Sequence, residues 1–363
     1  MIVQFVFLSF LTFISVVKIA SYLCRSRYRL KCSSEHKEAR IASLICSKND
    51  KINKELVEVL KKESDVYILT GGKNKAEAIN NWVKKHGKNY DFIGIFDYDS
   101  EVEEGFYKKI LKYFDRDVAF VQAKIYGKDG FMKEEVQRFF ENRIPLCFLS
   151  CGHNVVYRAD VLLKNPLPET MGEDFLHSIE LFKRGYKSVL AEDVKSYEKN
   201  PKTLKFIERD IKWSGNEVLF VKKIPDVLKL KIPILKRLEI FSDFLRCIIA
   251  LIVLSTMLAF RLDIISQIIA IALGAIASRP KTIKSALLLP LITTSAFGFI
   301  KGLFTNKKVF VPTSQLNYKK YVTAILALNI IISFIYAFNF VNVIFFSLLL
   351  ITSIVLMIRI CTE

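Results

Sequence analysis

The stretch Phe92-Ile-Gly-Ile-Phe-Asp-Tyr-Asp99 decides the fold of this chain. Its apolar part is typical of a short buried strand, and the strand runs directly into two carboxylates. Similar apolar runs stand earlier, at residues 41–45 and 66–69, and helical periodicity follows them at 54–62 and 76–85. Strands that alternate with helices predict an α/β fold with a mixed, mostly parallel sheet, whose ligands bind beyond the carboxyl ends of the strands.

The two carboxylates, Asp97 and Asp99, suit one kind of site. In an extended chain, residues two apart point to the same side. A hard divalent ion is held well by one or two carboxylates together with the oxygens of a substrate diphosphate. Such an ion would act as a Lewis acid on a departing diphosphate. If this pair is considered alone, a solvated turn remains the alternative to a metal site.

A second acidic pair, Glu173-Asp174, opens a predicted helix after the run Cys151-Gly-His-Asn-Val-Val-Tyr-Arg158. The amide dipoles of a helix start keep a carboxylate ionised, so Asp174 could accept a proton as a general base. The alternative is an ordinary acidic residue at a helix start. His177 shares the helix face with Asp174, although a single histidine is more often structural.

Composition indicates a membrane protein rather than a nucleic-acid-binding one. The chain of 363 residues is 52% hydrophobic, and its net charge is +18. Each Lys or Arg near an anionic cytoplasmic leaflet contributes about 1 kcal/mol of binding. No basic stripe with interleaved aromatic residues stands apart from the apolar segments, so we expect no nucleic-acid partner. The seven cysteines are scattered without the spacing of a zinc site, and we expect reduced thiols.

The N-terminal apolar run predicts a transmembrane helix over residues 1–24. No basic residue precedes the run, which disfavours a cleaved signal peptide. The basic cluster Arg25, Arg27, Arg29 and Lys31 follows it at once. By the positive-inside rule, the segment after the helix lies in the cytoplasm, and residues 39–217 form a cytosolic domain there.

The C-terminal part predicts amphipathic interface helices at 218–239 and a transmembrane region at 240–360. Four spans are expected, at residues 240–260, 264–278, 321–338 and 341–358. An apolar segment at 283–303 is placed in the interface, because crossing would leave several lysines outside. The prediction is a multi-pass protein of the cell membrane with about five crossings.

Six segments fall in an order that resembles a known family. They are Ile45–Asp50, Asn74–Asn80, Phe96–Ser100, Gly152–Arg158, Gly172–Asp174 and Arg209-x-x-Lys212-Trp213. Over residues 39–217 the chain resembles the membrane-integrated family 2 glycosyltransferases, the group of hyaluronan synthase, cellulose synthase and ceramide glucosyltransferase. The segment Val309–Ser314 resembles the gating loop of the synthases, without its Trp.

The resemblance implies a GT-A fold, inverting transfer and a divalent metal, Mg²⁺ or Mn²⁺. It implies a nucleotide-sugar donor, with a UDP-sugar favoured, and a membrane lipid or growing glycan as acceptor. It also implies residue roles: Asp99 for the metal, Asp174 as general base, Trp213 under the acceptor, and Lys75, Asp97, Arg209 and Lys212 at the donor. Asp50 is placed at the donor as well, where it or Asp65 would replace in part an Asp-rich turn of the family.

Two departures from the family keep alternatives open. Lys212 stands where the family has Arg, which keeps the charge and loses the bidentate fork. The run Tyr67–Gly72 lacks the Asp-rich turn that contacts the nucleotide in the family. The alternatives are a processive polysaccharide synthase and a non-catalytic membrane scaffold with a degenerate GT-A domain.

Overall fold

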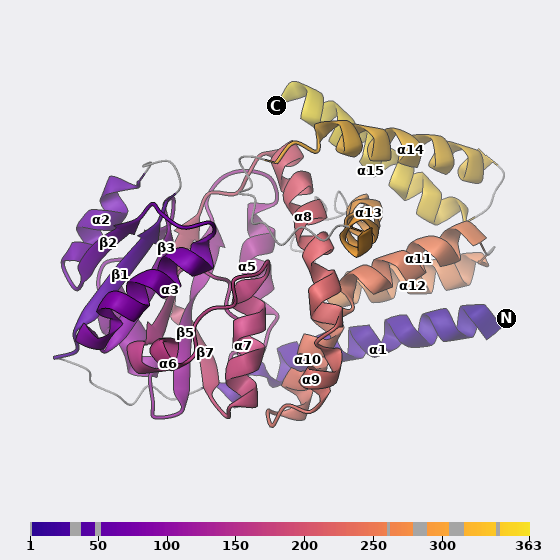
Figure 1. Ribbon diagram of the computed structural model, residues 1–363. Coiled ribbons are helices and arrows are strands. Elements are labelled where there is room, and N and C mark those ends of the chain that lie inside the picture. The colour runs from indigo at the N-terminus through magenta and orange to yellow at the C-terminus, as the bar shows by residue number, and fades with distance from the viewer. Residues whose placement is uncertain are drawn as a thin grey trace.

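A seven-stranded sheet is the centre of one half of the molecule (Figure 1). The computed structural model describes residues 2–29, 38–47, 52–259, 262–278, 289–304, 316–338 and 342–363. Within them the strand order is β2-β1-β3-β6-β5-β7-β4. The strands are β1 (Ile41–Cys46), β2 (Asp65–Leu69), β3 (Phe92–Asp97), β4 (Glu101–Val102), β5 (Val118–Gly127), β6 (Val155–Arg158) and β7 (Lys187–Glu198).

The sheet is mixed, as predicted, although parallel pairs do not outnumber antiparallel ones among the described strands. β1 pairs in parallel with β2 and β3, and β5 pairs in parallel with β7. β6 is antiparallel to both β3 and β5, and β4 is antiparallel to β7. The three predicted strands are β1, β2 and β3, so the alternation of strand and helix in the first hundred residues was interpreted correctly.

Helices cover both faces of the sheet because alternate strand residues point to opposite sides. On one face Ile45 and Phe96 pack against Leu56 and Leu60 of α2 (Lys54–Lys61), together with α4 (Phe106–Ile110). On the other face lie α3 (Lys75–His86), α6 (Ala159–Lys164) and α7 (Glu173–Lys183). Each fully buried apolar side chain of this kind contributes about 1.5–3 kcal/mol to folding.

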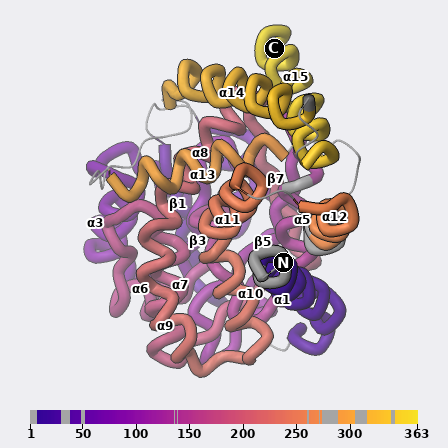
Figure 2. Tube along the Cα trace, turned by 90° about the vertical axis from the view of Figure 1, so that its right-hand side faces the viewer, coloured from indigo at the N-terminus to yellow at the C-terminus, as the bar shows by residue number. Residues whose placement is uncertain are grey.

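The apolar helices lie together beyond the sheet, at the end where the N-terminus projects (Figure 1). They are α1 (Ile2–Cys24), α11 (Arg246–Ala259), α12 (Ile264–Ser278), α13 (Leu291–Phe304), α14 (Lys319–Phe338) and α15 (Val343–Thr362). Figure 2 shows α14 and α15 along one edge of this group and α1 on the other side. The described residues also form the helices α5 (Lys133–Glu141), α9 (Ile224–Leu228) and α10 (Ile234–Phe244).

Among the described residues, three helices are long and apolar enough to cross a membrane. They are Phe7–Tyr28, Lys319–Ala337 and Val343–Thr362, and a fourth span arises if α10 and α11, which meet at 56°, count as one. This count is smaller than the five crossings we expected, because α12 has 15 residues and α11, which has 14, is long enough only together with α10. The division of the chain into domains stays a prediction, and α8 (Thr203–Val221) runs past the predicted boundary at 217.

Helix α8 joins the sheet to the apolar helices, and α13 packs directly on its backbone. A β-carbon added to Gly298 would stand 2.4 Å from the Ile211 carbonyl oxygen, and one added to Gly302 would stand 2.5 Å from that of Gly215. Such close approach requires glycine at the contact. Beside it the buried Asp210 of α8 accepts hydrogen bonds from Thr294 and Ser295 of α13, in addition to an ion pair from Arg246 of α11. The contact ties α8 rigidly to two apolar helices.

The first helix is held to the sheet side by ion pairs. The carboxylate of Asp243 on α10 forms ion pairs with Lys18 of α1 and with Arg143, which follows α5. Two more cations at the end of α1, Arg25 and Arg29, pair with Glu192 of β7. The basic cluster that predicted the orientation of α1 therefore contacts the sheet side of the molecule.

Candidate active site

The site begins where β3 ends, at Asp97. Its carboxylate accepts a hydrogen bond from the amino group of Lys75, the first residue of α3. That helix starts there because the Asn74 side chain accepts the backbone N–H of Glu77 at 2.8 Å, as helix-capping residues do. Burial alone would raise the pKa of Asp97, but the charges of Lys75 and of His153 hold it below the ordinary value. Asp97 is thus a paired carboxylate.

Asp99 reaches the site by a turn rather than along an extended strand. β3 stops at Asp97, and the backbone N–H of Ser100 donates to the Asp97 carbonyl at 3.1 Å. The expectation that both carboxylates share one side of a strand was therefore wrong in its geometry. Desolvation and the neighbouring charge of Asp97 raise the pKa of Asp99. A raised pKa indicates a carboxylate whose charge lacks compensation.

The acidic pair Glu173-Asp174 forms the first turn of α7, as the sequence predicted. Gly172 precedes it with a left-handed φ of 70°, and Asp174 Oδ1 accepts the Phe175 N–H at 2.9 Å. Burial raises the pKa of both acids, and the charge of Asp174 adds to the effect on Glu173, whose pKa reaches about 7. Such a pair can release and take up a proton near neutral pH.

Helix α8 brings three predicted residues to this edge of the sheet. Burial lowers the pKa of Lys212 to about 8, against the charges of Glu173, Asp97 and Asp174, which raise it. Lys212 therefore lies within electrostatic reach of both acidic pairs. The Arg209 guanidinium stands 4.7 Å from the ring centre of Trp213, a cation–π distance, and the Trp213 ring is half exposed.

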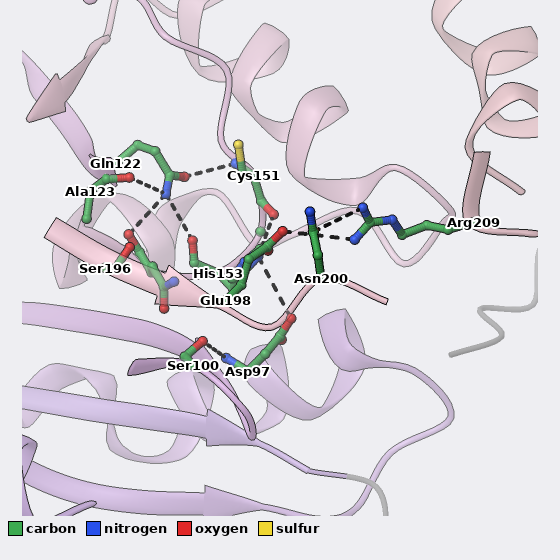
Figure 3. Close-up of polar contacts among 12 residues, drawn as sticks. Asp97, Ser100, Gln122, Ala123, Cys151, His153, Ser196, Glu198, Asn200 and Arg209 are labelled. Carbon is green, nitrogen blue, oxygen red and sulfur yellow. Dashed lines mark hydrogen bonds and ion pairs between the residues drawn. The ribbon is translucent and has the colours of Figure 1, made fainter. Parts of the chain in front are cut away.

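The sequence analysis missed His153 and Glu198, which stand between these groups (Figure 3). His153 Nε2 lies 3.1 Å from Glu198, its Nδ1 lies 3.8 Å from Asp97 Oδ2, and Glu198 lies 3.9 Å from Arg209. His153 and Glu198 therefore form a series of ionisable groups between Asp97 and Arg209. The only sequence signal was the polar triplet Gly152-His-Asn154 ahead of an apolar strand.

The side chain of Gln122, a wholly buried residue of β5, forms hydrogen bonds with the backbone of the loop that carries His153. The Gln122 amide nitrogen donates to the carbonyl oxygens of His153 and Asn154, each at 3.0 Å, and its oxygen accepts the Cys151 N–H at 2.9 Å. Gly152 and Asn154 have left-handed φ values of 78° and 51°. These bonds fix the position of the loop.

A divalent ion fits this edge only together with substrate oxygens. Among the described residues, no group of three or more His, Cys, Asp or Glu side chains could hold a metal by itself. Mg²⁺ commonly takes one or two carboxylates and completes its shell with phosphate oxygens and water. The uncompensated carboxylate of Asp99 suits that role, so the residues present fit a metal that arrives with the donor.

Most of the predicted site residues converge at one edge of the sheet. Lys75 pairs with Asp97, Lys212 reaches both acidic pairs, and Arg209 joins the network through Glu198. Two of the predicted features lie outside the described residues, namely Asp50 and the loop 309–314.

The fold and a comparison with known families identify an enzyme that transfers a sugar. The model of glycosyl transferase family group 2 matches residues 92–359, which is more than half of the chain. The chain belongs to this family and is a glycosyltransferase. The match covers the site edge from β3 onward and continues through the apolar helices to α15.

A solved structure with a similar fold is the mannosyltransferase PcManGT from Pyrobaculum calidifontis, in complex with GDP-Man and Mn²⁺. It has 13% sequence identity and a TM-score of 0.50, and the match covers 82% of this chain and 100% of that one. The likeness supports the GT-A type of fold. A197 from STIV matches 44% of this chain and 86% of its own at 17% identity and a TM-score of 0.34, too low to carry an argument. A search of curated protein sequences found no significant match.

Proposed function

We propose that the chain is an inverting glycosyltransferase that moves a sugar from a nucleotide sugar to a membrane lipid at the cytoplasmic face. One observation carries the proposal: a cation–carboxylate pair, a second acidic pair and the cations of α8 meet at one edge of the sheet. Ligands of open α/β sheets bind at such an edge.

The proposed chemistry is a single displacement with Asp174 as base. Asp174 takes the proton of the acceptor hydroxyl while the hydroxyl oxygen attacks the anomeric carbon and the nucleoside diphosphate departs from the opposite face. Lys212 and Arg209 stabilise the charge that develops on the diphosphate. Lys75 orients Asp97 toward the donor, and Trp213 offers an exposed ring to the acceptor.

A divalent metal, when bound with the donor, supplies Lewis-acid stabilisation of the leaving diphosphate. Asp99 is the residue we assign to it. The solved mannosyltransferase contains Mn²⁺ and GDP-Man, which supports a metal and a nucleotide-sugar donor without selecting the base. The preference for a UDP-sugar stays a prediction.

The helix ends support a common membrane orientation. At the sheet end, the Tyr318 N–H donates to Glu208 of α8 at 2.6 Å, and the Thr203 N–H donates to the Glu363 side chain at 2.8 Å. At the opposite end, the Leu262 N–H donates to Asn342 Oδ1 at 2.8 Å. The starts of α12 and α15 thus meet far from the sheet, as they would if both lay outside.

A lipid acceptor is favoured over a growing glycan by the three or four candidate spans among the described residues, a small set to surround an extending polymer. The half-exposed Trp213 lies on α8, the helix against which the apolar helix α13 packs, so an acceptor arriving from the bilayer would meet it.

The test is turnover by protein purified in detergent with a panel of UDP- and GDP-sugars. Release of nucleoside diphosphate is measured with and without a lipid extract. We expect one donor to be consumed only when lipid is present, with the label recovered in the lipid phase. Transfer into a water-soluble polymer would favour the processive synthase, and no consumption of any donor would contradict the proposal.

A further inference from the structure

His153, at the centre of Figure 3, is the basis of an inference that goes beyond the proposed donor site. His153 Nδ1 lies 3.0 Å from the Cys151 carbonyl oxygen, and Nε2 lies 3.1 Å from a Glu198 carboxylate oxygen. A carbonyl oxygen and a carboxylate only accept hydrogen bonds, so both ring nitrogens must donate. The ring in this arrangement is an imidazolium cation.

The charge of His153 sits between two carboxylates, at a position where solvent screens it little. The side chains of His153, Glu198 and Arg209 are 16%, 21% and 13% exposed. Charges that are largely withdrawn from water interact more strongly than surface pairs. Burial would lower the pKa of His153, but Asp97 and Glu198 raise it to about 9, in agreement with the hydrogen bonds.

Without this cation the edge of the sheet would carry more negative charge. Asp97, Asp99 and Glu198 would then face a negatively charged donor diphosphate, and Lys75, Lys212 and Arg209 would be left to balance them. Glu198 would draw more strongly on the charge of Arg209, because His153 would no longer neutralise it. The buried Gln122 anchors the His153 loop through its backbone, so the ring position does not depend on substrate contacts.

We propose that His153 is a positioning residue of the donor site, which neutralises Glu198 and thereby leaves Arg209 available to the nucleoside diphosphate. We call the series of neighbouring charged residues Asp97, His153, Glu198 and Arg209 the relay. It couples the end of β3 to helix α8, two elements that hold opposite sides of the donor site. The inference rests on the proposed function, because it assigns a diphosphate to this edge.

The test compares a single with a double substitution and is read by binding rather than by turnover. His153→Gln keeps an amide donor for Glu198 and removes the charge. We expect the dissociation constant for UDP or GDP, titrated calorimetrically with Mn²⁺, to rise at least tenfold. His153→Gln/Glu198→Gln removes one positive and one negative charge, and its dissociation constant should return to within about threefold of the original.

The matched control is His177→Gln, at a buried histidine whose Nε2 bonds the Asn165 carbonyl oxygen, outside the relay. We expect it to leave the dissociation constant unchanged. Thermal unfolding midpoints of all four proteins report on folding.

The possible results distinguish a failure of the inference on His153 from a failure of the proposed function. Equal binding by the original protein and His153→Gln would overturn the inference and leave the proposed function intact. Equally weak binding by the single and double variants, at unchanged unfolding midpoints, would reduce His153 to a loop-shaping residue. If the original protein binds neither UDP nor GDP, the donor site itself is misassigned and the inference fails with it.

Discussion

Gly152 lies directly against the carboxylate of Asp174. A β-carbon built at Gly152 would stand 3.1 Å from Asp174 Oδ2 and 3.4 Å from its β-carbon. The loop that carries His153 therefore packs against the proposed base. Because Gly152 also has a φ of 78°, a larger residue there would have a strained backbone as well as a tight contact with Asp174.

The proposed base can be separated from a binding residue by Asp174→Asn. The change keeps size and much of the hydrogen bonding while removing basicity. General base catalysis typically contributes about 10² to 10⁴ in rate, so transfer should fall by at least that range. Affinity for the nucleoside diphosphate should stay within a few-fold. A parallel collapse of affinity would make Asp174 a donor-binding residue, and Glu173 would become the candidate base.

Asp99 should be required for metal-dependent turnover. Asp99→Asn removes the carboxylate that we assign to the ion, and turnover should be lost with it. EDTA should have the same effect on the original protein, and added Mn²⁺ or Mg²⁺ should restore activity. Undiminished turnover of Asp99→Asn in the presence of chelator would exclude the metal role.

The pH dependence of turnover should be bell-shaped, with its maximum between about 7 and 8. Rate should rise as the Glu173-Asp174 pair loses its proton, since the pKa of Glu173 is about 7. It should fall at higher pH as Lys212, with a pKa of about 8, loses its charge. Lys212→Arg keeps the charge and should move the alkaline limb upward. An unmoved alkaline limb would remove Lys212 from the assignment, and Lys301→Arg, on α13, serves as control.

The glycine contact between α8 and α13 should be sensitive to a single methyl group. A β-carbon at Gly298 would stand 2.4 Å from the Ile211 carbonyl oxygen and 2.9 Å from the Ser214 β-carbon. Overpacking of this kind costs about 1–3 kcal/mol, so Gly298→Ala should lower the unfolding midpoint and weaken donor binding. Ile300→Ala, at a 44% exposed position of the same helix, should change neither. Equal behaviour of the two variants would argue against the contact.

Membrane sidedness can be tested with cysteines introduced at Asp263 and at Lys319. Asp263 precedes α12 at the end far from the sheet, and Lys319 opens α14 at the sheet end. In intact cells a membrane-impermeant thiol reagent should label the Asp263 position and spare the Lys319 position. Labelling at Lys319 from outside would invert the proposed orientation, and permeabilised cells provide the control for reactivity.

The sequence predicted the local elements of the site and missed what connects them. The strands before Asp97 and the helix start at Asp174 follow from hydrophobic periodicity and acidic first turns, which are local signals. The antiparallel placement of β6 and the partnership of His153 with Glu198 depend on contacts between distant parts of the chain, 45 positions apart for His153 and Glu198, which no local pattern reports. The extended geometry assumed for Asp99 failed because β3 ends at Asp97 and the chain turns there.

The close approach of α13 to α8 also makes the thickness of the surrounding bilayer relevant to the enzyme. With 14 residues, α13 is about 21 Å long, too short to cross a hydrocarbon core of about 30 Å, which agrees with its predicted place in the interface. Two helices in backbone contact cannot slide past one another, so a change in the depth of α13 must move α8 as well. Moving α8 would displace Lys212 and Arg209, and the acyl-chain length of the host lipid would thereby affect how the site holds the leaving group.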